Sequence, residues 1–518
     1  MRAMSTIRTA LALMLASTPL TALPLPVLAQ EKAQEQDVII LREPPRAVLS
    51  AHSYLDRIEA VDDNGPALNA VIVVNPDAPM EAGKAVQLPL GGRTVLVKDN
   101  IETREWPTTA GSLALKDNRT ERDAPLIANL RAAGGVVLGK TNLSEWANFR
   151  DTSSSSGWSA VGGLTRNPYA LDRTACGSSS GSGAAIAADL AWAAIGTETD
   201  GSITCPAAIN GIVGFKPTVG MVSRTHVVPI SVSQDTAGPM AKSVPDAALL
   251  LWAITGSDPA DPATAEADKY RPGLTSGIAT SSLKGVRIGV LVQRVGPRKD
   301  IGALFGTALD DLRGAGAILV DVEYQPDPAI GHDEFTVLLF EFREGLDAYL
   351  GSLPNTAQPR SLAEVITFNE ANADTELRWF GQSLFIMAQE TTDREAYEAA
   401  RANSLRLAGP EGIDKLLRGN DVAVLIAPTN NPAWTIDLVN GDNFTGGVGL
   451  TGLAAVAGYP HLTVPMGAVE GLPIGLSFIG TKWDDARVLA IGAAYERVRS
   501  AELAAPSLEP WGEGEALP

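Results

Sequence analysis

The N-terminal third of the chain alternates between two hydrophobic patterns. In some segments apolar residues recur every three or four positions, as on one face of a helix, and in others they form short runs rich in β-branched residues. Gly134 and Gly135 follow one helical segment and mark its C-terminal end. In chain order, the pattern predicts a helix over 47–61, strands over 71–74 and 94–97, a helix over 123–133 and a strand over 136–138.

The same alternation returns after residue 285. It predicts, in order, a strand over 286–292, a helix over 301–313 and strands over 317–322 and 422–426. Alternating helices and strands are typical of an α/β fold. We therefore predict a mixed, mostly parallel sheet that is covered by helices on both faces.

Two segments depart from this alternation. Residues 256–273 are rich in Asp, Pro and Ala, which predicts a surface loop or insertion. Residues 334–412 have helical periodicity and few strand signals, so we predict a helical layer over the sheet. No internal repeat interrupts the pattern, and we interpret residues 30–518 as a single domain with this helical layer.

The first 29 residues differ from the rest of the chain. Arg2 and Arg8 precede a largely apolar stretch that ends in small residues near Ala29, as in a cleaved secretory signal peptide. The alternative is an anchoring N-terminal helix, but three prolines would interrupt a spanning helix, at positions 19, 24 and 26. The sequence therefore predicts a secreted or periplasmic protein with no membrane association after cleavage.

Composition and charge exclude several classes of protein. The 518 residues are 45% hydrophobic and include 50 Gly without a triplet repeat, which excludes disordered and collagen-like chains. Without residues 1–29 the net charge is −21. Such a charge repels phosphate backbones and anionic lipid surfaces, so nucleic acid is not an expected partner.

The cysteines and histidines give no metal signature. The two cysteines, Cys176 and Cys205, are compatible with a disulfide in an exported protein and equally with two buried thiols. The four histidines are scattered, and neither C-x-x-C nor H-E-x-x-H occurs. We therefore expect no metal site.

The stretch from Gly177 to Ser202 carries the strongest chemical signal. It begins with Gly-Ser-Ser-Ser-Gly-Ser-Gly, continues as an Ala-rich helix and a short strand, and ends with Gly-Thr-Glu-Thr-Asp-Gly-Ser. Small residues in such turns let backbone N–H groups converge on an anion, as in an oxyanion hole. A flexible linker is the alternative, but linkers are not followed by a helix and a buried strand.

These residues resemble the amidase signature hydrolases. The resemblance rests on Lys98 in Val-Lys-Asp-Asn, on the two Gly/Ser turns and on the 24-residue spacing from Ser178 to Ser202. It extends over most of the chain and is closest to the bacterial peptide amidases, through residues 139–146, 409–414 and 458–460.

The resemblance implies a role for each matching residue. Ser202 is the implied nucleophile, Ser178 the bridging serine held by a cis peptide bond, and Lys98 the base. The implied oxyanion hole consists of backbone N–H groups of Thr199, Asp200, Gly201 and Ser202. The sequence differs from the residues that are most frequent in the family at three positions, where Ser180, Glu198 and Asp200 replace Gly, Asp and Gly. The difference at Asp200 lies in the turn that would form the oxyanion hole.

The chemistry of the residue types agrees with these roles. A serine hydroxyl needs a base to become a nucleophile, and a free lysine, with a pKa of about 10.4, is almost always protonated at pH 7. Burial can lower a lysine pKa by up to about 3–5 units. We expect an amidase that needs no cofactor and acts on small-molecule or peptide amides, and the resemblance implies C-terminal peptide amides in particular.

Other interpretations explain less of the sequence. Residues 134–141 match the P-loop pattern, but they include a predicted strand where a P-loop needs a loop. Residues 177–181 also match the elbow of an α/β-hydrolase-like serine esterase, with Ser179 as nucleophile and His226, His332 or His461 as its partner. Two further alternatives are a secreted binding protein that has lost activity and a component of tRNA-dependent transamidation. The first would be free to lose Lys98, Ser178 or Ser202, and all three are present. The second acts on tRNA, from which an exported protein is separated.

Overall fold

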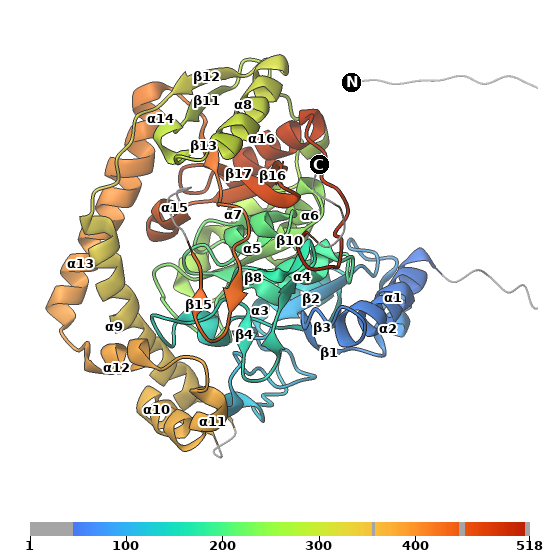
Figure 1. Ribbon diagram of the computed structural model, residues 1–518, viewed down its shortest axis with the longest axis vertical. Coiled ribbons are helices and arrows are strands. Elements are labelled where there is room, and N and C mark those ends of the chain that lie inside the picture. The colour runs from blue at the N-terminus through green and yellow to red at the C-terminus, as the bar shows by residue number, and fades with distance from the viewer. Residues whose placement is uncertain (1–44, 355–357, 445–450, 513–518) are drawn as a thin grey trace, which may run out of the picture. The chain divides into compact units, whose positions relative to one another are not determined.

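A long mixed β-sheet organises the part of the chain that the computed structural model describes, residues 45–354, 358–444 and 451–512 (Figure 1). The predicted signal peptide over 1–29 lies outside the described residues. Within them, eleven strands pair into this sheet in the order β1 (Val71–Val74), β3 (Val136–Thr141), β2 (Thr94–Lys98), β8 (Ala193–Glu198), β10 (Thr236–Ala241), β9 (Val213–Lys216), β16 (His461–Val469), β17 (Leu472–Ile479), β13 (Val424–Pro428), β11 (Arg287–Val290) and β12 (Ile318–Asp321).

The sheet is parallel on its flanks and antiparallel at its centre. Strand β2 is parallel to both β3 and β8, and β11 is parallel to both β12 and β13. The central strands β10, β9, β16, β17 and β13 pair antiparallel with one another, and β1 is antiparallel to β3 at one edge. The parallel pairings are those that the helix–strand alternation predicts, whereas the antiparallel centre was not foreseen.

Helices cover both faces of the sheet, as predicted. Val95 and Val97 of β2 belong to one hydrophobic core, and Leu96 between them belongs to another, because neighbouring strand residues point to opposite faces. The first core is closed by α3 (Pro125–Ala132), α6 (Val244–Ile254), α8 (Lys299–Gly314) and α16 (Asp485–Val498). The second is closed by α1 (Arg46–Arg57), α2 (Ala78–Ala85) and α4 (Ser180–Ala187).

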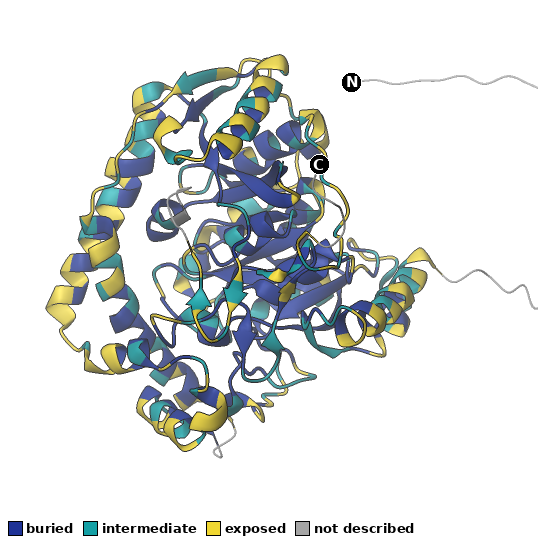
Figure 2. Cartoon of the chain, viewed as in Figure 1, coloured by how far each residue is buried: buried dark blue, intermediate teal, exposed yellow. Residues whose placement is uncertain are grey.

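The segment predicted as a helical layer is helical in the structure. It contains α9 (Ala329–Ser352), α10 (Leu362–Ala371), α11 (Ala373–Glu376), α12 (Ser383–Glu390) and α13 (Arg394–Ala408). Helices α9 and α13 run side by side (Figure 1), where Phe340 stacks on Tyr397 at 4.3 Å between ring centroids. Their outer sides are exposed and their inner sides are buried (Figure 2).

Two details differ from the sequence prediction. Residues 256–273 are not an irregular loop throughout, since three short helical turns lie there, over Pro262–Glu266, Ala267–Tyr270 and Arg271–Gly273. Strands β16 and β17 form a hairpin that was not predicted, with Glu470 and Gly471 both at positive φ in its two-residue turn.

No helix among the described residues has the length and apolar character that a membrane-spanning helix needs.

Candidate active site

The ends of two parallel strands bring the predicted site segments together. Strands β2 and β8 lie side by side with Val97 opposite Ile195, so both end at the same edge of the sheet. Lys98 is the last residue of β2, and the turn that carries Ser202 follows β8. Helix α4 begins two residues after Ser178. The carboxyl edge of parallel strands is where α/β proteins place their ligands.

The side chain of Lys98 lies among hydroxyl groups. Its Nζ lies 2.7 Å from Ser178 Oγ, 3.1 Å from Ser179 Oγ and 2.9 Å from Thr197 Oγ1. Thr197 Oγ1 also accepts a hydrogen bond from Asn100 Nδ2 at 3.0 Å. In the described part of the chain, no carboxylate forms an ion pair with Lys98. The ammonium form would therefore be buried without a neutralising partner.

Burial lowers the pKa of Lys98 to about 7. The side chain is completely buried, and loss of water disfavours its charged form. The negative charges of Asp235 and Glu198 act in the opposite direction and raise the pKa. The net result is that about half of the molecules carry an uncharged amine at pH 7. Such an amine can accept a proton.

The two serines lie on turns that are joined through the backbone. The Gly177–Ser178 peptide bond is cis, as the family resemblance implies. The N–H of Ser179 donates to the carbonyl oxygen of Ser202 at 3.1 Å. Ser178 is fully buried, whereas Ser202 keeps 8% of its surface exposed. Ser202 is therefore the serine of this pair that a ligand can approach.

Two carboxylates hold the turn between β8 and α5 (Thr204–Ile209). Asp235 accepts a hydrogen bond from Thr199 Oγ1 at 2.5 Å, and Glu198 Oε2 accepts from the N–H groups of Ile203 at 2.7 Å and Thr204 at 2.9 Å. Within the part of the chain that the structure describes, the N–H groups of Gly201 and Ser202 donate to no protein acceptor. The turn therefore presents backbone donors that can receive an oxygen atom from a ligand.

A cavity of about 540 Å³ opens beside this turn. Gly177 and Gly201, which precede the two serines, both line it. Its opposite wall comes from residues 152–156, from residues 429–434 and from residues 440–444. Trp434 and Phe444 in that wall form an edge-to-face pair, with ring centroids 5.1 Å apart. The cavity thus combines polar backbone and hydroxyl groups with an aromatic surface, and it can contact both polar and apolar groups of a ligand.

Glycines under the site allow very close backbone packing. A Cβ atom on Gly181 would lie 2.3 Å from the carbonyl oxygen of Ala70 and 2.6 Å from that of Asn142. A Cβ atom on Gly196 would lie 2.8 Å from Ser179 Oγ. Because real Cβ contacts are longer, these two positions accept no side chain without movement of the serine turns.

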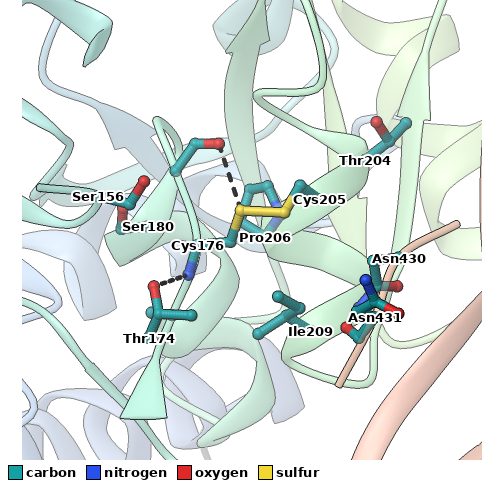
Figure 3. Close-up of a disulfide and its surroundings, with 12 residues drawn as sticks. Ser156, Thr174, Cys176, Ser180, Thr204, Cys205, Pro206, Ile209, Asn430 and Asn431 are labelled. Carbon is teal, nitrogen blue, oxygen red and sulfur yellow. Dashed lines mark hydrogen bonds between the residues drawn. A yellow bond between two sulfur atoms is a disulfide. The ribbon is translucent and has the colours of Figure 1, made fainter. Parts of the chain in front are cut away.

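The sequence was compatible with either a disulfide or two free thiols at Cys176 and Cys205, and the structure contains the disulfide. Cys176 and Cys205 are bonded to each other, and their Cα atoms lie 6.1 Å apart (Figure 3). Cys176 precedes the first Gly/Ser turn and Cys205 lies in α5, so the bond spans the two turns. Both cysteines line the cavity.

The structure gives no support to the alternative motifs. Lys140 of the P-loop pattern lies inside β3 and forms an ion pair with Asp99 at 2.9 Å. Ser179, the nucleophile of the esterase interpretation, has its Oγ bonded to Lys98 and to the backbone of Thr197. His461 instead contacts Ser477 Oγ at 2.7 Å. Among the described residues, no group of three or more His, Cys, Asp or Glu side chains could hold a metal ion.

Some residues of the site were not foreseen. Thr197 lies in β8, in the second Gly/Ser motif of the sequence, and its contact with Lys98 follows from the parallel pairing of β2 and β8. Asp235 lies outside every motif, and its sequence surroundings carry no signal of a contact with Thr199. Glu198 was noted only as a departure from the family spelling, whereas the structure shows that it holds the backbone after Ser202.

Comparison with known proteins identifies relatives along most of the chain. The family model described as Amidase matches residues 50–489. A probable amidase of Arabidopsis thaliana is 38% identical over 460 residues, which are 85% of each chain. A glutamyl-tRNA(Gln) amidotransferase chain of Symbiobacterium thermophilum is 34% identical over 488 residues, 89% of this chain and 95% of that protein.

A solved structure also resembles this chain closely. Native peptide amidase from Stenotrophomonas maltophilia superposes with a TM-score of 0.82 and 47% sequence identity. The match covers 89% of this chain and 95% of that one.

Proposed function

This chain belongs to the amidase family and is an enzyme that hydrolyses amide bonds, and from that premise we propose that Lys98, Ser178 and Ser202 carry out the reaction. The observation that carries the proposal is the 2.7 Å contact between Lys98 Nζ and Ser178 Oγ, in a buried site where none of the described carboxylates pairs with the lysine. A buried amine with a pKa of about 7 is suited to accept a proton near neutral pH.

In the proposed acylation step, protons move along the three side chains. The uncharged amine of Lys98 takes the proton of Ser178, Ser178 takes the proton of Ser202, and Ser202 Oγ attacks the amide carbonyl carbon. The oxygen of the tetrahedral intermediate accepts hydrogen bonds from the backbone N–H groups of the turn at Thr199, Asp200, Gly201 and Ser202. One such donor typically contributes about 10²–10³ in kcat.

The same groups then act in reverse. Lys98 returns its proton through Ser178 to the leaving nitrogen, the carbon–nitrogen bond breaks, and ammonia leaves an ester of Ser202. Water attacks this ester as its proton passes through Ser178 to Lys98. The tetrahedral intermediate then expels Ser202 Oγ, which takes this proton back from Lys98 through Ser178, so that the carboxylic acid is released and Lys98 and both serines are restored. The side chains and water account for every proton in this sequence of steps.

We propose C-terminal amides of peptides as the substrates. The 47% identity to the Stenotrophomonas maltophilia peptide amidase supports this choice, as does a cavity of about 540 Å³ lined by backbone groups, hydroxyl groups and the Trp434 and Phe444 rings. A cavity of that size accommodates about two residues of a peptide next to the nucleophile.

Ammonia release tests both proposals. The purified enzyme is incubated with a blocked dipeptide amide, with the matching free acid, with benzamide and with free glutamine. We expect fast ammonia release from the dipeptide amide and a fall on the order of 10⁴-fold or more in Ser202→Ala. Unchanged turnover in Ser202→Ala would contradict the mechanism, and equal rates with benzamide and the dipeptide amide would contradict the substrate class.

We also propose that the protein is exported. The disulfide between Cys176 and Cys205 supports this proposal, because such bonds persist in oxidising compartments. N-terminal sequencing of the protein recovered from the producing cells should find a chain that begins near residue 30, in the fraction outside the cytoplasm. Recovery of the uncleaved chain in the cytoplasm alone would contradict export.

A further inference from the structure

A single covalent bond connects the two turns that carry the proposed catalytic serines. Cys176 lies two residues before Ser178, and Cys205 lies three residues after Ser202. Figure 3 shows the bond running from the segment before α4 to the first turn of α5. The proposed relay requires a proton to pass between the hydroxyls of Ser178 and Ser202, so this bond constrains the relative position of the two turns on which the relay depends.

The other links between these turns are hydrogen bonds. The N–H of Ser179 donates to the carbonyl oxygen of Ser202 at 3.1 Å, and Asn210 Nδ2 donates to the carbonyl oxygen of Ala175 at 2.9 Å. Cys205 N–H donates to the carbonyl oxygen of Gly201, which holds the second turn onto α5. Ser179 Oγ is also hydrogen-bonded to the backbone of Thr197, so without the disulfide the first turn would be held against the second by hydrogen bonds and packing.

The disulfide also borders the cavity that we assign to the substrate. Both Cys176 and Cys205 line it, together with Gly177 and Gly201. Cys176 keeps 5% of its surface exposed, and Cys205 is half-buried. Part of each cysteine therefore borders the cavity, and a bound substrate would cover it.

We propose that the Cys176–Cys205 disulfide positions Ser178 against Ser202, and that thiol reductants reach it through the substrate cavity. This inference rests on the proposed function. With dithiothreitol, one thiolate attacks a cysteine Sγ and displaces the other Sγ as a thiolate, and the second thiol of the reagent then closes a ring. Two electrons and two protons pass to the protein, which gains two thiols, and the reagent leaves as its cyclic disulfide.

The first experiment reduces the native enzyme. Because the chain has two cysteines, an Ellman titration that finds two thiols per chain reports this pair alone. We expect kcat with a blocked dipeptide amide to fall about 10- to 100-fold, because a small displacement of reacting groups has effects of this size. KM should change by a smaller factor than kcat, and some change is expected because Ala433 and Trp434 of the opposite wall pack in the same hydrophobic cluster as Cys176 and Cys205. Reoxidation should restore kcat.

The Cys176→Ser/Cys205→Ser variant should reproduce the reduced enzyme and should not respond to dithiothreitol. Phenylmethylsulfonyl fluoride, which labels reactive serines, should react more slowly in step with the fall in kcat. Unchanged kcat in protein with two free thiols would overturn the positioning role. Loss of the near-UV circular dichroism spectrum on reduction would overturn it too, because the bond would then be needed for the fold as a whole.

The second experiment tests the route to the sulfur atoms. In Ser202→Ala, which binds a dipeptide amide without consuming it, a saturating concentration of that amide should slow the appearance of thiols at least about fivefold. The matched free acid at the same concentration is the control for non-specific effects. Equal rates with and without the amide would overturn the proposed route. Failure of the proposed function is separate, because it would appear as ammonia release by Ser202→Ala in the absence of any thiol.

Discussion

Two buried lysines on neighbouring strands have different partners. Lys98 ends β2, and Lys140 lies in β3 opposite Val97. Lys140 Nζ lies 2.9 Å from Asp99 Oδ1 and also donates to the carbonyl oxygen of Ile101 at 2.8 Å. The contacts of Lys98 are hydroxyls and a carbonyl oxygen. Both lysines are therefore buried, but among the described residues only Lys140 of the two has a carboxylate at ion-pair distance.

This difference distinguishes a lysine held in an ion pair from the lysine that we propose as the base. A carboxylate at ion-pair distance compensates a buried ammonium, and removal of either partner leaves an isolated charge. Hydroxyl groups solvate an ammonium less completely, so burial at Lys98 favours the uncharged amine and lowers its pKa to about 7. Two lysines on adjacent strands of one sheet thus differ in a way that suits Lys140 to stability and Lys98 to the proposed proton transfer.

The largest expected effect comes from removal of the Lys98 amine. Lys98→Met should reduce kcat/KM for a dipeptide amide on the order of 10⁴-fold or more, because the proposed relay then has no base next to Ser178. Its urea unfolding midpoint should not fall, since methionine fills a similar volume without the cost of a buried amine. Lys98→Arg is the matched control and should also be inactive, because a guanidinium stays charged. Activity within tenfold of wild type in either variant contradicts the role of Lys98 as base.

Lys140→Met should show the reverse pattern. Asp99 would be left buried without its cation, and we expect the free energy of unfolding to fall by about 3–5 kcal/mol. Urea denaturation measures this loss, and Lys140→Met/Asp99→Asn should recover part of it because the second change removes the unpaired charge. The folded fraction should retain kcat. If Lys140→Met is as stable as wild type, the assigned difference between the two lysines is wrong.

The pH dependence of the reaction should report the Lys98 amine. Below about pH 7 the amine becomes protonated, so kcat/KM should fall towards a tenfold loss per pH unit, and it should level off above that pH. The folded pKa is lower than the unfolded value of about 10.4, so the unfolded chain binds more protons between these values and stability should rise with pH across that window. Lys98→Met should remove this contribution to the slope. A rate that is flat from pH 5 to pH 8 contradicts an uncharged lysine base.

The smallest expected effect comes from a neighbouring charge. Asp235 raises the pKa of Lys98, and burial raises the pKa of Asp235 itself to about 6, so Asp235 is mostly ionised where Lys98 titrates. Asp235→Asn should therefore move the acid limb of the rate profile to lower pH, by less than about one unit. Glu198→Gln should move it in the same direction, and the exposed Asp437→Asn should leave it in place. Movement to higher pH in Asp235→Asn contradicts the assigned interaction.

The sequence located the proposed reactive residues better than the residues that support them. Lys98, Ser178 and Ser202 could be proposed because small residues surround both serines and an apolar run precedes the lysine, and the structure places Lys98 next to Ser178. Asp235 and the contact between Glu198 and the backbone after Ser202 could not, because both depend on how remote segments fold back on the turn. A local pattern carries no information about such contacts.

The predicted fold was incomplete for a related reason. Strands β2, β3 and β8 each contain a short apolar run, and the sequence identified all three. The antiparallel strands at the centre contain prolines, at Pro239 in β10, Pro465 in β16 and Pro473 in β17. Proline removes a backbone donor and usually argues against a central strand. Here the sheet accommodates at least one of them beside a change of register, between Pro465 and Gly467.

The glycines under the serine turns also bear on how this protein can evolve. Gly181 and Gly196 lie against backbone carbonyls and a serine hydroxyl, so almost any replacement displaces the reaction centre. The opposite wall of the cavity, formed by residues 152–156 and 429–444, has no such restriction, and its side chains face a space that a ligand can fill. New substrate preferences should therefore arise through substitutions in that wall. A mutant library aimed at a different amide should vary the wall residues and leave Gly181 and Gly196 unchanged.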